Sequence, residues 1–80
     1  MLTANALRQY IADHLPHTLI EVKGDDGAHF EATIVSAEFE GKSRVQRHQR
    51  VYAALGDRMR EEIHALSMKT LTPAEHAAQA

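Results

Sequence analysis

Hydrophobic residues recur along the chain with two spacings, and these spacings predict its helices and strands. Near the start, Leu7, Ile11 and Leu15 step by four residues, which places them on one face of a helix. Thr3 is a suitable N-cap before this stripe, and Pro16 would end a helix after it. The pattern therefore predicts a first helix between Thr3 and Pro16.

The next stretch, residues 18–36, alternates apolar and polar positions and predicts two strands. Between them, residues 24–27 read Gly-Asp-Asp-Gly, a composition typical of turns. Alternate residues of a strand share a face, so Phe30 and Ile34 lie on one face and His29 on the other. We expect an antiparallel hairpin with an apolar inner face.

Helical spacing returns in the second half of the chain and predicts a helix from about Ser43 to Arg58. Its apolar stripe steps by three or four residues through Val45, His48, Tyr52, Leu55 and Met59. Arg47, Arg50 and Arg58 would then fall on or near the opposite face. Gly56 weakens the last turn, so the helix is expected to bend or end there.

The final third of the chain predicts a strand over residues 63–70, followed by a short helix. Thr72 is the expected N-cap, Pro73 occupies the first helical position and Glu75 follows three residues after the cap, which is a capping box. The predicted order is helix, strand, strand, helix, strand, helix. This order predicts an α+β two-layer domain with a three-stranded mixed sheet and helices packed on one face.

Composition narrows the class of protein. Eighty residues suffice for one domain, expected to span 1–80 with a frayed tail, and the absence of Cys excludes disulfides and clusters held by the chain's own thiolates. We find neither a signal-peptide pattern nor an apolar run near the roughly 20 residues that span a bilayer. A soluble, cytoplasmic protein is expected.

Charge is distributed unevenly although the net charge is only −2. Six of the nine Lys and Arg residues lie in the range 42–60, where Asp57 is the only acid. This basic run is a candidate nucleic-acid contact surface, although a solvated helix face is the commoner cause of such a run. The candidate contact residues are Lys42, Arg44, Arg47 and Arg50.

No enzymatic signature is present, so we expect a protein that is not an enzyme and has no catalytic residues. The chain lacks a Cys nucleophile, a nucleophile elbow, a Walker loop, a dinucleotide fingerprint and a zinc-protease motif. Asp25 and Asp26 are adjacent in the predicted turn, where turn formation accounts for them.

Six histidines raise the question of metal binding. His14 and His17 flank a helix-ending proline and are expected to form a surface pair, while His48 is expected at the core edge with a satisfied hydrogen bond. Histidine can replace thiolate on one iron of a 2Fe–2S cluster, so a chain without Cys can contribute ligands to a shared cluster. His29 and His64 are the candidates, and for His64 the spacing fits burial as well as ligation.

Two longer stretches resemble a known family. FEGKSRVQRHQRVYAAL, residues 39–55, and IHALSMKTLTPAE, residues 63–75, are similar to the BolA family and within it to the short IbaG-like (YrbA-like) branch. The resemblance implies a class II KH-like fold. It also implies a partnership with monothiol glutaredoxins in iron–sulfur cluster trafficking and iron homeostasis.

The same resemblance implies a set of ligands. A 2Fe–2S cluster would be shared, with the glutaredoxin thiol and glutathione on one side and His64 plus a loop residue on the other. In many relatives the loop residue is a Cys or His that aligns here with Asp26, and the nearby His29 is the substitute. Protonated imidazole has no lone pair, so cluster binding is expected to weaken below about pH 6.5, the reference histidine value.

The family also includes proposed DNA-binding stress-response regulators, which keeps nucleic-acid binding as the alternative function. KH domains that bind RNA use a GxxG loop, whereas the matching turn here, residues 41–44, reads Gly-Lys-Ser-Arg without the second glycine. This departure weakens the expectation of backbone clamping. Without its partner the protein is expected to be a monomer or a weak homodimer.

Overall fold

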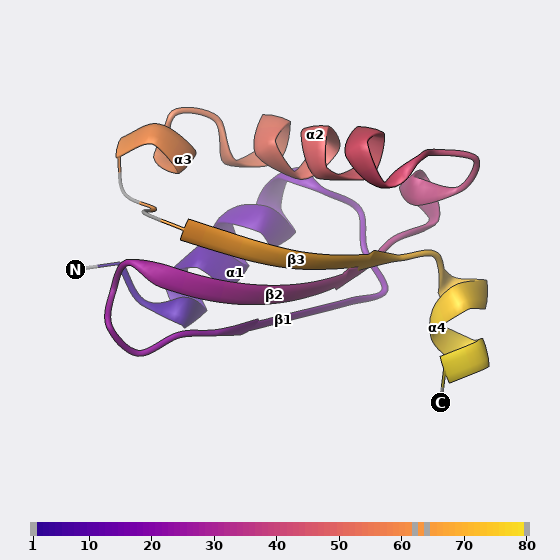
Figure 1. Ribbon diagram of the computed structural model, residues 1–80, viewed down its shortest axis with the longest axis horizontal. Helices are drawn as coiled ribbons and strands as arrows, with labels where there is room; N and C mark the ends of the chain where they lie inside the picture. Colours follow the sequence, from indigo (N-terminus) through magenta and orange to yellow (C-terminus); the bar gives the residue numbers. More distant parts are fainter. Residues whose placement is uncertain (1, 62, 64, 80) are drawn as a thin grey trace.

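The structure is a computed structural model that describes residues 2–61, 63 and 65–79. The elements follow the predicted order, with two short helical segments added (Figure 1). They are α1 (Ala4–His14), β1 (Leu19–Lys23), β2 (His29–Val35), the 3-10 turn η1 (Ala37–Phe39), α2 (Arg44–Leu55), α3 (Arg58–Glu61), β3 (Ala65–Leu71) and α4 (Pro73–Gln79).

The first helix and the hairpin are as predicted. The Thr3 hydroxyl accepts a hydrogen bond from the Ala6 amide at 3.0 Å, which caps α1, and Leu7 and Ile11 are fully buried. β1 pairs with β2 in antiparallel fashion, and Phe30 and Ile34 lie in the core. Helical spacing with its cap, turn chemistry and alternation were therefore sufficient to predict α1 and the hairpin.

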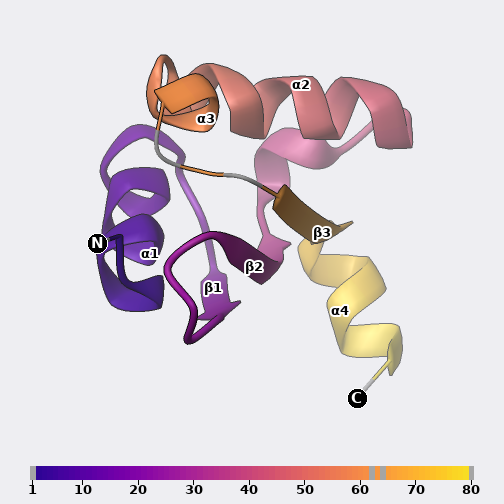
Figure 2. The same cartoon turned by 60° about the vertical axis from the view of Figure 1, so that its left-hand side comes forward.

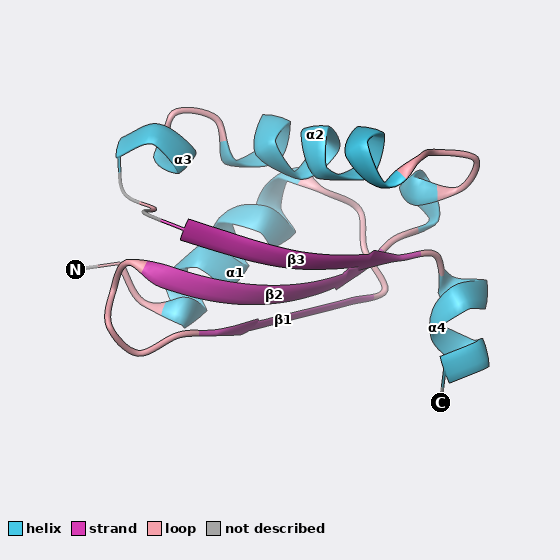
Figure 3. Ribbon diagram, viewed as in Figure 1, coloured by secondary structure: helices cyan, strands magenta, loops and turns pink. Residues whose placement is uncertain are grey.

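β2 is the central strand of the sheet, because β3 joins its other edge in parallel (Figure 3). The chain crosses from β2 to β3 through α2 and α3, and this helical crossover permits the parallel pairing. The register places His29 opposite Ala65 and Glu31 opposite Ser67. The predicted three-stranded mixed sheet is confirmed.

The two long helices, α1 and α2, cover one face of the sheet (Figure 2). The core lies between these helices and the sheet, and its largest members are Phe39, Leu7, Ile11, Leu15, Ile34 and Leu55. The C-terminal helix α4 lies beyond the end of β3, away from α1, and none of its residues is buried. This architecture leaves the second face of the sheet largely uncovered. None of the described helices is long and apolar enough to cross a membrane.

The predicted bounds and apolar stripe of the long helix need correction. α2 ends at Leu55 rather than Arg58, and the predicted break at Gly56 is confirmed, since Gly56 adopts a φ of 58° as the C-cap and the short helix α3 follows. Leu55 of the predicted stripe is buried, but Val45 is 66% exposed and Tyr52 is 39% exposed, while Val51, which lies outside that stripe, is fully buried. The helix is therefore rotated relative to the stripe that hydrophobicity alone selected.

The arginines explain this rotation. Arg47 and Arg50 were predicted on the solvent-facing side, but their side chains are only 13% and 27% exposed. Long apolar stems let arginine lie at the core margin while its guanidinium meets hydrogen-bond acceptors. That behaviour cannot be read from a hydrophobic stripe.

The C-terminal elements begin and end close to their predicted positions. β3 starts at Ala65 rather than at residue 63; Ile63 lies outside the strand but is buried in the core. The capping box is confirmed, since the Glu75 amide donates to Thr72 Oγ1 at 3.1 Å and the Thr72 amide donates to Glu75 Oε1 at 2.7 Å.

Candidate functional site

The turn between β1 and β2 lies at the same end of the sheet as the start of β3 (Figure 1). His29 is the first residue of β2 and is in register with Ala65, whose amide donates to the Ala28 carbonyl at 3.0 Å. A surface hollow at this end is lined by residues of all three strands, including Lys23 of β1, His29 of β2 and Ser67 of β3. Parallel pairing thus brings the hairpin turn beside the entry to the third strand.

Asp26 organises this turn through both of its carboxylate oxygens. Oδ1 accepts hydrogen bonds from the amides of Ala28 at 2.9 Å and His29 at 2.8 Å, and Oδ2 lies 2.8 Å from Nδ1 of the His29 ring. The His29 amide, then the Ala28 amide, and the His29 side chain hold the pKa of Asp26 well below its ordinary value. Asp26 therefore stays ionised and fixes the orientation of the His29 ring.

Gly24 permits this compact turn. A Cβ atom at this position would lie 2.6 Å from the carbonyl oxygen of His29 and 2.7 Å from Cδ1 of Phe30. Phe30 is 3% exposed, so the side chain that a substituent would meet is anchored in the core. The Gly-Asp-Asp-Gly pattern correctly predicted a turn but did not reveal this close approach.

The structure brings together some of the predicted ligand residues. Asp26 and His29 form one unit, and His64 lies outside the described residues, directly before Ala65 in the sequence. His14 and His17 each place Nδ1 near a main-chain carbonyl, that of Tyr10 at 3.0 Å and that of Leu15 at 2.8 Å. Among the described residues, no group of three or more His, Cys, Asp or Glu side chains is arranged to hold a metal ion.

His48 differs from its prediction. The residue is half-buried as expected, but its Nε2 atom is buried and makes no hydrogen bond with any described residue. The satisfied hydrogen bond expected there is therefore wrong. His48 lies three residues before Val51 and seven before Leu55, so it shares their face of α2, and its ring is half-buried at the margin of the core.

The predicted nucleic-acid contact residues divide into two pairs. Lys42 and Arg44 are exposed. Arg47 instead donates to the carbonyls of Lys42 at 2.9 Å and Thr70 at 3.2 Å, and its Nη1 donates to Glu75 at 2.7 Å. Arg50 is likewise occupied, since it donates to Glu38 Oε1 at 2.9 Å and to the His14 carbonyl at 3.2 Å.

The link from Arg47 to Glu75 escaped sequence reasoning, because the two residues are distant in the chain and nothing in their spacing joins them. The Arg47 guanidinium, together with the Thr72 amide, lowers the pKa of Glu75. Glu75 therefore serves the capping box of α4 and the attachment of α4 to α2 at once.

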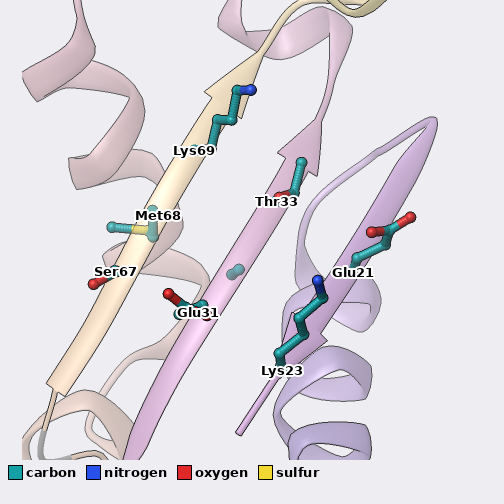
Figure 4. Close-up of a pocket in the computed structure, with 8 residues that line it drawn as sticks. Glu21, Lys23, Glu31, Thr33, Ser67, Met68 and Lys69 are labelled. Carbon is teal, nitrogen blue, oxygen red and sulfur yellow. The ribbon is translucent and has the colours of Figure 1, made fainter. Parts of the chain in front are cut away.

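The uncovered face of the sheet carries a second, polar hollow (Figure 4). Its side chains come from all three strands, with Lys23 paired in register with Glu31 and Thr33 paired with Lys69. Opposite charges across neighbouring strands stabilise a solvated sheet surface. This is the polar outer face expected of a sheet that its long helices cover on one side only.

Comparisons with known proteins agree with the fold and the motifs. A sequence profile described as BolA-like protein matches residues 8–75. The DNA-binding transcriptional regulator BolA of Haemophilus influenzae is 46% identical over 52 residues, which are 65% of this chain and 50% of that protein. The chain thus spans about half the length of the curated relatives it matches, with 58% for human BolA-like protein 1.

Solved structures extend the similarity to nearly the whole chain. A bolA protein homologue from Coxiella burnetii superposes with a TM-score of 0.87 and 42% identity, covering 96% of this chain and 99% of that one. The BolA domain of SufE1 from Arabidopsis thaliana gives a TM-score of 0.80 and 35% identity over 94% of this chain and 99% of that domain. The similarity therefore covers both the helical layer and the hairpin end.

Proposed function

This chain belongs to the BolA family, and from this premise we propose that it is a non-enzymatic partner of a monothiol glutaredoxin. The two proteins and glutathione would share a 2Fe–2S cluster and pass it on in cytoplasmic iron–sulfur trafficking or assembly and iron homeostasis. The assignment to the IbaG-like branch stays a prediction. The chain has no Cys, so every thiolate ligand would come from the glutaredoxin and glutathione.

The observation that carries this proposal is the Asp26–His29 pair beside the start of β3. Metal-bound histidines usually donate their other ring N–H to a carboxylate or carbonyl, and imidazole is an established ligand of 2Fe–2S iron. His29 has such a carboxylate partner at 2.8 Å, so the residues present fit an imidazole ligand. We propose His64, the residue that precedes Ala65, as the other ligand from this chain.

The residues of this chain would supply imidazole donors, hold them in place and leave the thiolate positions to the partner. When bound, the cluster is the cargo, and no reaction on this chain is required. The ligating histidines must be neutral, because a protonated imidazole has no lone pair for iron. His29 is preferred over Asp26 as the loop ligand, since both Asp26 oxygens are engaged in the turn.

Reconstitution with a glutaredoxin tests the proposal. The cluster is assembled on the glutaredoxin with glutathione, and visible circular dichroism is recorded with and without this protein. We expect the spectrum to change when the wild-type protein is added and the change to be lost or altered in His64→Ala and His29→Ala. His14→Ala, which removes an exposed histidine of α1, is the control and keeps the wild-type spectrum. A wild-type spectrum from His64→Ala would remove that residue from the ligand set.

A second candidate function is DNA binding. One relative is named a DNA-binding transcriptional regulator, and Lys42 and Arg44 are exposed at the start of α2. The test is a band-shift titration at several salt concentrations. If this function holds, binding weakens steeply with salt, and the double variant K42Q/R44Q reduces the salt dependence by about two counterions. Absent binding, or binding that does not respond to salt, would exclude it.

A further inference from the structure

The family resemblance implies a loop ligand at or near Asp26, and in this structure the Asp26 carboxylate contacts the ring of His29. We propose that Asp26 is a positioning residue that holds His29 with its proton on Nδ1, so that the Nε2 atom carries the lone pair for a metal. The use of that lone pair for a cluster rests on the proposed function. The tautomer itself is a property of the metal-free protein and is tested separately.

The tautomer follows from the donor and acceptor capacities of the two side chains. An ionised carboxylate only accepts hydrogen bonds, so at 2.8 Å from Asp26 Oδ2 the Nδ1 atom of His29 must be the donor. A neutral imidazole has one donor and one acceptor nitrogen. The proton on Nδ1 therefore leaves the lone pair of a neutral ring on Nε2, and this is the tautomer that binds a metal through Nε2.

The carboxylate is itself held in place. Oδ1 accepts hydrogen bonds from the amides of Ala28 and His29. These bonds fix the plane of the carboxylate and direct Oδ2 to the ring. Gly24 lets the turn close against the His29 carbonyl and the Phe30 ring. The Asp26–His29 contact is thus built into the turn, while the His29 side chain stays 60% exposed and within reach of a partner protein.

The competing assignment, in which Asp26 is itself the ligand, is less consistent with this geometry. Ligation through Oδ2 would displace the Nδ1–H hydrogen bond, and ligation through Oδ1 would crowd two amide donors. Known 2Fe–2S centres use thiolate and imidazole, which are softer donors than carboxylate. The structure therefore assigns the two residues different roles, with His29 as donor and Asp26 as its support.

Asp26→Asn is the decisive variant, because it can keep the main-chain hydrogen bonds of the turn while it changes the tautomer of His29. The amide oxygen of Asn can replace Oδ1 and keep both main-chain hydrogen bonds. Its NH₂ group then replaces Oδ2 and donates to Nδ1, which drives the proton of His29 to Nε2. Asp25→Asn is the matched control, since it makes the same change of charge in the same turn at a carboxylate for which the described residues show no hydrogen bond.

The experiment combines ¹⁵N NMR of the histidine rings in the metal-free protein with binding to the cluster-loaded glutaredoxin. We expect wild type and Asp25→Asn to show protonated Nδ1 at neutral to slightly alkaline pH, and Asp26→Asn to show protonated Nε2 with the Ala28 and His29 amide signals retained. Affinity for the loaded partner should fall about 10- to 100-fold in Asp26→Asn alone.

The outcomes separate this inference from the proposed function. A neutral His29 ring that carries its proton on Nε2 in the wild type would overturn the role of Asp26 whatever the cluster does. An inverted tautomer in Asp26→Asn with unchanged affinity would also overturn it, since the ring nitrogen would then not matter to binding. If instead the tautomers behave as expected and no cluster complex forms with any variant, the proposed function fails while the Asp26–His29 pairing stands.

Discussion

Arg47 and Glu75 join α2 to the first turn of α4: Nη1 of Arg47 lies 2.7 Å from Oε1 of Glu75. The same carboxylate oxygen accepts the Thr72 amide at 2.7 Å, so it also caps α4. Arg47 further donates to the Thr70 carbonyl at the end of β3. One guanidinium thus connects α2, β3 and α4. This connection matters because α4 has no buried residue and therefore gains little from apolar packing.

Arg47→Ala is therefore expected to lower the free energy of unfolding by about 2 kcal/mol, because it removes several hydrogen bonds from a charged and mostly buried donor. Arg47→Lys should recover only part of this, since an ammonium cannot form the same forked contacts. Urea denaturation measures the difference. Arg44→Ala, on the exposed side of the same helix, is the control and should change stability by less than about 0.5 kcal/mol. Equal effects at both positions would contradict the assigned role of Arg47.

Acid should weaken the same junction. The pKa of Glu75 is lower in the folded chain than its ordinary value of 4.5, first because of the Arg47 side chain and then the Thr72 amide. A carboxyl group with a lowered folded-state pKa stabilises the fold above its unfolded value, and this contribution is lost as the pH falls through the folded value. Glu75→Gln should therefore be less stable than wild type at neutral pH, and the difference should shrink below about pH 4.5. Urea midpoints measured across this range check it, and a constant difference would refute it.

The rotated face of α2 gives a matched pair of variants. Val51→Ala removes two methyl groups from a fully buried site and should cost about 2 kcal/mol. Val45→Ala makes the same change on the same helix at a site that is 66% exposed, and should cost less than about 0.5 kcal/mol. Thermal or urea unfolding distinguishes them. A larger loss of stability in Val45→Ala than in Val51→Ala would contradict the observed face of α2 and support the stripe that hydrophobic spacing predicted.

These cases show what the sequence determined and what it left open. Caps and periodicity located α1, the hairpin and the start of α4, because Thr3, Pro16 and the Thr72–Glu75 box act through neighbours a few residues away. The face of α2 depended instead on Arg47 and Arg50 finding acceptors on distant segments. Such long-range polar contacts leave no periodic signal.

The candidate site, like the fold, was predicted from the sequence only in part. Residue type and family resemblance singled out Asp26 and His29, but only the structure showed that they bind one another. The family resemblance left both residues open, with His29 as the candidate ligand and Asp26 as a possible one, because a resemblance considers one position at a time. The observed contacts support our proposal that Asp26 holds His29, because a carboxylate with both oxygens committed to the turn holds a neighbouring ring more readily than it binds iron.

Gly24 offers a test of how the turn holds the site. Gly24→Ala would place a methyl group within 2.6 Å of the His29 carbonyl, so the hairpin must shift and stability should fall by more than about 1 kcal/mol. The His29 ring signals should move as well. Gly41→Ala is the comparison, because its φ is also positive, at 73°, but its Cβ would meet open space. Unchanged His29 signals in Gly24→Ala would show that the turn does not depend on this glycine.

The central claim is that this chain provides imidazole ligands to a cluster shared with a glutaredoxin, and pulsed electron paramagnetic resonance tests it most directly. The protein is labelled with ¹⁵N-histidine, combined with unlabelled cluster-loaded glutaredoxin and glutathione, and the cluster is reduced. We predict a ¹⁵N hyperfine coupling of directly bound imidazole that persists in His14→Ala and is reduced or lost in His64→Ala and His29→Ala. A reduced cluster in the complex without any ¹⁵N coupling would contradict the claim.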